Sequence, residues 1–137
     1  MTPPSHPEEQ VNFRISIEAV TQRELSYEFD KDVRLSEGTM HFPPGCNSLV
    51  EMRVLMGTGS ARKQITPIND QFIALDDAVF HFLLDQKLAR KERVFVEVAN
   101  YDEDNPHIVS TIISYIDEKT ASDDEGQEQA TGRRRRA

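Results

Sequence analysis

Five acidic residues stand beside turn-forming positions, where their carboxylates could hold a metal ion. They form two short clusters: Asp76 and Asp77, then Asp102, Glu103 and Asp104. Calcium takes oxygen ligands of this kind from loops. The spacing matches no EF-hand loop, however, and the four histidines lack the pairing of zinc ligands. Acidic turns are usually only hydrated, so we predict no metal site.

Cys46 is the only cysteine in the chain and so the only candidate thiol nucleophile. A catalytic thiolate needs a base, and His41 or His107 would have to serve. Cys46 directly follows the turn Pro43-Pro44-Gly45. The chain has neither a G-x-S-x-G elbow nor a Ser, His and Asp set in a recognisable order. We therefore predict an unreactive thiol and a protein that is not an enzyme.

Binding of phosphate, free or in nucleic acid, has little support in the folded part of the chain. The formal net charge is −8, whereas nucleic-acid surfaces need clustered Lys and Arg. Gly57-Thr58-Gly59 lacks the third glycine and the following helix of a phosphate loop, so we expect no cofactor. The C-terminal run of four arginines is different. It predicts either a segment that contacts nucleic acid or an acidic partner, or a tail that only keeps the chain in solution. Its residues are Arg133, Arg134, Arg135 and Arg136.

Both ends of the chain are too polar to build a core. Residues 1–10 contain three prolines and no large apolar residue after Met1, and residues 119–137 contain no Val, Ile, Leu, Phe or Tyr. Such segments bury too little surface to offset the entropy of ordering, so we predict flexible arms around one domain at 11–118. No apolar run is long enough to span a membrane, and no signal-peptide pattern is present. We expect a soluble protein made in the cytoplasm.

Apolar and polar residues alternate with a period of two along most of this domain, which is the pattern of half-buried strands. The clearest segments are 13–19, 25–29, 33–35, 40–42, 50–56 and 94–98, and a further extended segment at 108–116 closes the domain. Turn residues such as Pro43-Pro44-Gly45 separate them. About seven to nine short strands at even spacing predict an all-β fold, a single antiparallel β-sandwich that is jelly-roll-like.

Residues 77–90 are ambiguous between strand and helix. Phe80 and Phe82 alternate as in a strand, whereas Val79, Leu83 and other apolar residues also suit one face of a helix. Asp76 or Asp77 would then be the N-cap of that helix. The segments on either side are plainly extended, so we favour strands.

The last strand is apolar on both faces. Val109, Ile113 and Tyr115 share one face, and Ile112 and Ile116 share the other. An antiparallel sheet commonly exposes one face to water. One of the two apolar faces is therefore covered either by another part of the domain or by another subunit. We predict that Val109, Ile113 and Tyr115 form a subunit interface and that Ile112 lines the core.

One stretch resembles small jelly-roll modules of virion structural proteins, over roughly residues 40–117. The matching segments are Phe42-Pro43-Pro44-Gly45, Leu49 to Val54, Phe72 to Ala78, Asn100-Tyr101-Asp102 and Asn105-Pro106-His107. The segment Val79 to Lys91 is richer in Leu and Lys than such modules. The resemblance implies a non-enzymatic building block that oligomerises or decorates a larger shell or tail, located in the virion.

The sequence thus favours a structural or interaction protein, a homo-oligomeric subunit or decoration of a larger, viral assembly. Its partners would be copies of itself and other structural proteins of that assembly. The alternative is a β-sandwich module that binds a carbohydrate or an ion through Tyr101, Asp102 and Asp104.

Overall fold

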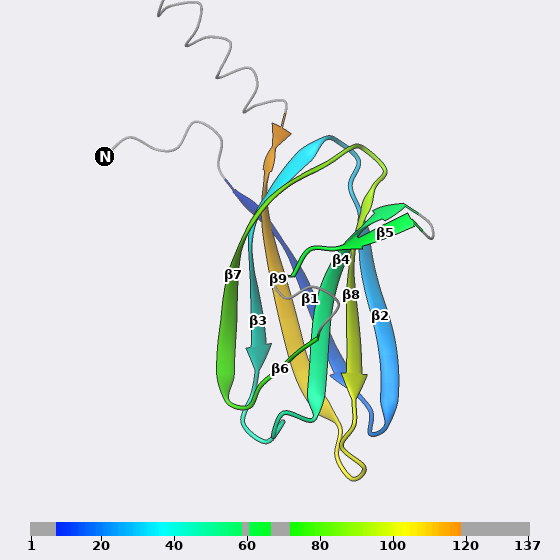
Figure 1. Cartoon of the computed structure of the whole chain (residues 1–137), viewed down its shortest axis with the longest axis vertical. Coiled ribbons are helices and arrows are strands. Elements are labelled where there is room, and N and C mark those ends of the chain that lie inside the picture. The colour runs from blue at the N-terminus through cyan, green and yellow to red at the C-terminus, as the bar shows by residue number, and fades with distance from the viewer. Residues whose placement is uncertain (1–7, 59–60, 67–71, 119–137) are drawn as a thin grey trace, which may run out of the picture.

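The computed structural model describes residues 8–58, 61–66 and 72–118. Nine β-strands run through these residues and form two antiparallel sheets that stack face to face (Figure 1). The strands are β1 (Glu9–Ile17), β2 (Thr21–Glu28), β3 (Val33–Phe42), β4 (Val50–Thr58), β5 (Ala61–Gln64), β6 (Ile73–Ala74), β7 (Ala78–Leu88), β8 (Arg93–Asn100) and β9 (His107–Asp117). The predicted all-β sandwich is confirmed.

The strand pairing is that of a long hairpin rolled into two layers. β1 pairs with β9, β2 with β8, β3 with β7, and β4 with β5. The first strands of the chain therefore pair with the last ones, and the middle strands pair with each other. The first sheet has the order β1-β9-β3-β7, and the second has β2-β8-β4-β5 with β6 also on β4. This is the connectivity of a jelly roll.

The core lies between the two sheets and follows from the period-two pattern. Val94, Val96 and Val98 of β8 are all almost fully buried, whereas Glu97 points to the opposite face. Val96 lies opposite Val54 of β4 in the antiparallel register, which places both side chains in the same layer of the core. The predicted strand at 94–98 and its register are confirmed.

β3 is one continuous strand, where the sequence predicted two short ones. The pairing shifts between Leu35 and Glu37, so a β-bulge absorbs the irregular residues without ending the strand. Gly38, a turn signal in the sequence, instead gives room to an aromatic ring. A Cβ atom at Gly38 would lie 2.3 Å from Cζ of Phe82, which is buried.

Residues 78–88 form the strand β7, as favoured from the sequence. No helix begins at the preceding aspartates. The Asp76 carboxylate accepts hydrogen bonds from the backbone N–H groups of Gly45 (3.0 Å) and Asn47 (2.8 Å), and Asp77 has a left-handed backbone with φ of 48°. The aspartates therefore shape a tight turn into the strand.

The first strand begins close to the predicted start of the domain. β1 begins at Glu9, two residues before the predicted start at Val11. The predicted arms lie mostly outside the described residues, and so do Arg133, Arg134, Arg135 and Arg136. Within the described ranges, no helix is long and apolar enough to cross a membrane.

Candidate functional site

The two faces of β9 are assigned opposite to the sequence prediction. Val109, Ile113 and Tyr115 are 1%, 0% and 7% exposed and belong to the core between the sheets. Ile112 and Ile116 point outward and are partly exposed. The predicted interface residues are thus wrong, because a sandwich has one interior and β9 turns these three side chains into it. Both faces are apolar, so the alternation alone could not choose between them.

The outward face of the first sheet exposes large apolar side chains on two of its strands. Ile108 on β9 is 46% exposed, and Val79 and Leu83 on β7 are 61% and 80% exposed. Between β9 and β7 lies β3, which presents Thr39 and His41 to the same side. From the sequence, Val79 and Leu83 were considered only as part of a possible helix face, and none of Ile108, Val79 and Leu83 was predicted to be exposed. The signal was present at 77–90, where apolar residues occupy both alternating positions.

The outward face of the second sheet places charged side chains over its aromatic residues, beside a hollow of about 400 Å³ lined by Arg53, Phe72 and Glu97. Phe95 points outward, yet it is 4% exposed, because the guanidinium of Arg62 lies 3.9 Å from its ring centroid. Arg53 covers Phe72 in the same way at 4.6 Å and forms an ion pair with Glu97 at 2.6 Å. The two sheets therefore differ: the second covers its outward aromatic residues, and the first leaves apolar side chains in solvent.

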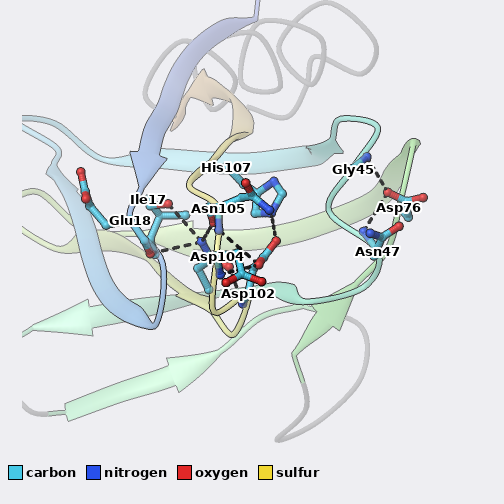
Figure 2. A network of polar contacts seen from close by, with 10 residues as sticks. Ile17, Glu18, Gly45, Asn47, Asp76, Asp102, Asp104, Asn105 and His107 are labelled. Atoms are coloured by element: carbon cyan, nitrogen blue, oxygen red, sulfur yellow. Dashed lines mark hydrogen bonds and ion pairs between the residues drawn. The ribbon is translucent and has the colours of Figure 1, made fainter.

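The acidic loop between β8 and β9 is a hydrogen-bonded network rather than an open site (Figure 2). One carboxylate oxygen of Asp102 accepts from the backbone N–H groups of Asp104 (2.9 Å) and Asn105 (3.2 Å), and the other lies 2.8 Å from Nε2 of His107. The hydrogen bond from the Asp104 N–H and that of His107 lower the pKa of Asp102 to about 2. Asp102 is therefore ionised and already satisfied by its own chain.

Asn100 ties this loop to the opposite sheet. Its side-chain amide donates to the backbone carbonyls of Ile17 (3.1 Å), Glu18 (3.1 Å) and Asn105 (3.0 Å), and its Oδ1 accepts from the N–H of Asp102. Asn100 is buried, so these bonds replace the water that its amide would lose. The network thus fixes how the loop leaves β8 and enters β9.

The residues of the alternative carbohydrate or ion site face different partners. Tyr101 is 52% exposed, and its hydroxyl donates to Glu51 of the second sheet at 3.0 Å. The carboxylate of Asp102 turns instead to His107, at the start of β9. Across the ranges that the structure describes, no three His, Cys, Asp or Glu side chains come together around a point that could hold a metal ion.

Cys46 lies in the core, with no exposed surface. Burial raises the pKa of its thiol, and the negative charge of Asp76 raises it further. Both effects favour the neutral thiol, which is the weaker nucleophile.

A shallow groove of about 650 Å³ runs over the loop end of the first sheet. Arg14, His41 and Ser110 line it from three neighbouring strands, and Pro44 and Pro106 line it from the loops. None of its lining residues is acidic.

The comparisons with known proteins find likeness in fold and none in sequence. No protein-family model matches the chain, and no curated protein matches it. Among solved structures, the nucleoplasmin-like N-terminal domain of Drosophila FKBP39 aligns with a TM-score of 0.47 and 10% identity, over 85% of this chain and 94% of that one. The Yersinia pseudotuberculosis-derived mitogen aligns with a TM-score of 0.48 and 7% identity, over 78% and 86%.

Virion proteins are also among the similar folds. The VP2 subviral particle of infectious bursal disease virus aligns with a TM-score of 0.41 and 5% identity, over 82% of this chain and 33% of that one. Structures of the Gt strain of the same virus and of Desmodium yellow mottle tymovirus also align with this chain. Likeness at this level concerns the fold alone and carries no argument about function.

Proposed function

We propose that the chain is a non-enzymatic structural subunit that associates with copies of itself inside a larger assembly. The observation that carries this proposal is the contrast between the two outward faces. Charged side chains lie over the aromatic residues of the second sheet, whereas the first leaves Ile108, Val79 and Leu83 46%, 61% and 80% exposed.

The exposed side chains supply a driving force of a useful size. Burying an aliphatic side chain fully is worth about 1.5–3 kcal/mol. At their present exposures, the three residues together offer roughly 3–5 kcal/mol per subunit if a neighbour covers them. Costs of association reduce that figure, so further contacts must add to it in a stable assembly.

We place this assembly in a virion because residues 40–117 resemble the jelly-roll modules of virion structural proteins. The polar segments 1–7 and 119–137 suit the same role, because segments that order on contact can cover large areas of a neighbour. In such an assembly, Arg133 to Arg136 would meet nucleic acid or an acidic neighbouring subunit.

Sedimentation velocity of the full chain over a wide concentration range tests self-association. We expect species larger than the 15.7 kDa monomer. We expect Leu83→Asp, at the most exposed of these apolar side chains, to shift the distribution toward monomer without lowering the melting temperature much. Ser26→Asp adds the same charge to the outward face of the second sheet and should leave association unchanged. A chain that stays monomeric at all concentrations would overturn the proposal.

Ligand binding in the groove beside Arg14 and His41 is the second candidate, because that groove has polar donors and no acidic residue in its lining. Amide shifts of Arg14, His41 and Ser110 would report it during titration with sodium phosphate or with monosaccharides. Localised shifts in a monomeric chain would favour this function over assembly.

A further inference from the structure

The strand β7 forms an edge of the first sheet and has unusually little protection there. Among the described residues it pairs only with β3, so its other side carries backbone N–H and C=O groups without a partner strand (Figure 1). Edge strands are usually short, charged or interrupted by proline, because an unprotected edge pairs with other chains. β7 has eleven residues, and its first seven, Ala78–Leu84, contain neither a charge nor a proline.

The side chains of this edge are apolar on both faces. Val79 and Leu83 point outward and are the two most exposed large apolar residues of the first sheet. On the inward side Phe82 is buried, whereas Phe80 is only partly buried, and their rings stack with centroids 5.7 Å apart. A strand added beside β7 would cover Val79, Leu83 and Phe80 together.

We propose that two copies of this chain pair β7 against β7, antiparallel, about a two-fold axis at His81. The pairing joins the two first sheets into one continuous eight-stranded sheet. The inference rests on the proposed self-association and specifies the strand and register through which it occurs.

The register follows from matching the faces and the chemistry of the paired side chains. Outward residues must meet outward residues, so the axis must pass through a residue of β7 and not between two residues. With the axis at His81, Val79 lies opposite Leu83 and Phe80 lies opposite Phe82, so every apolar side chain meets another.

The neighbouring registers are poorer. An axis at Phe82 sets Val79 against the charged Asp85, and an axis at Leu83 sets Val79 against Lys87. The pairing between β3 and β7 also becomes irregular beyond Leu83, which limits the regular edge to the first part of the strand. The part of β7 without charged residues is therefore also the part that pairs regularly with β3. His81 is the midpoint of residues 78–84.

The environment of His81 is compatible with its place on the axis. Its Nδ1 lies 3.0 Å from Oγ1 of Thr39, and its Nε2 lies 2.9 Å from Oε1 of Glu37, both on β3. Each imidazole is thus held by its own chain, and a carboxylate accompanies each ring. Pairing of seven residues buries less than the roughly 1,600 Å² of a standard interface, so we expect a concentration-dependent dimer.

Disulfide trapping of the full chain tests the register. Directly opposed residues have Cα atoms about 4.5–5.5 Å apart, within the range of a disulfide. His81→Cys should therefore cross-link with itself under mild oxidation. Val79→Cys and Leu83→Cys should each fail alone, because each residue would lie about 14 Å from its own copy. An equimolar mixture of these two variants should give the mixed disulfide, identified by mass spectrometry.

Cys46 has no exposed surface, so the unsubstituted chain under the same oxidation provides the control and should remain uncross-linked. Circular dichroism melting checks that each variant is folded. Cross-linking of Leu83→Cys alone would overturn the register. Oligomers in sedimentation without cross-links at His81 or in the mixture would overturn the β7 pairing and leave the proposed function standing. A strictly monomeric chain would overturn both.

Discussion

The contact between Gly38 and Phe82 provides a stringent test of the packing inside the sandwich. A Cβ atom at Gly38 would lie 2.3, 2.7 and 2.9 Å from three carbon atoms of the Phe82 ring. The ring is 4% exposed and lies between the sheets, so it cannot simply swing into solvent. Gly38→Ala must therefore displace a core side chain or open the sheet.

The expected magnitude combines two opposing effects. Overpacking a core costs about 1–3 kcal/mol, whereas replacing a strand glycine by alanine stabilises by about 0.5–1 kcal/mol. We expect Gly38→Ala to lower the free energy of unfolding by about 1–2 kcal/mol. Urea denaturation followed by circular dichroism measures the change, provided that the transition is two-state.

A double-mutant cycle isolates the clash from other effects of the substitution. Phe82→Leu alone should cost roughly 1–2 kcal/mol through the space that it leaves. In that background, Gly38→Ala should cost nothing further, because the smaller side chain gives the methyl group room. If Gly38→Ala proves as stable as the parent chain, or if the two changes are simply additive, the close approach of ring and strand is refuted.

Three further results are expected. Ile113→Asp should unfold the domain, because it places a charge in the core, whereas Ile112→Asp should leave a folded chain; thermal melting that ranks them in reverse would contradict the assignment of the β9 faces. The pKa of Asp102 is lowered to about 2, so its contribution to stability is present above about pH 4 and is lost as the pH falls toward 2; Asp102→Ala should remove that part of the acid dependence in denaturation curves. Val96→Ala should cost about 1–3 kcal/mol in the free energy of unfolding, and Glu97→Ala well under that, and equal losses would mean that the register of β8 is wrong.

Much of the fold was predictable because the residues of the core recur at every second position along their strands. Val94, Val96 and Val98 recur at every second position, with Phe95 and the charged Glu97 between them, so one orientation of their strand buries all three. Residues 77–90 were harder, because their apolar residues suit a helix as well as a strand. The pairing of β7 with β3 makes this segment a strand, through backbone hydrogen bonds with residues about forty positions away in sequence. A local sequence pattern carries no information about such a distant partner.

The candidate surface was predicted only in part. The sequence indicated correctly that β9 has a second apolar face that does not line the core. It assigned Val109, Ile113 and Tyr115 to that outer face, whereas they lie in the core. It also gave no reason to separate the two outward sheet faces. That difference depends on Arg53 and Arg62, which cover Phe72 and Phe95 from positions that only the folded chain brings together.

The sequence by itself determined the class of fold and the buried face of strands that alternate cleanly, because local periodicity decides which side of a strand is apolar. Tertiary structure alone decided what happens where both sides are apolar. A sandwich has a single interior, and the pairing of β9 between β1 and β3 turns Ile113 into it and leaves Ile112 outside. The same pairing leaves β7 at the edge, with Val79 and Leu83 exposed, since the order of strands in a sheet is a property of the whole chain.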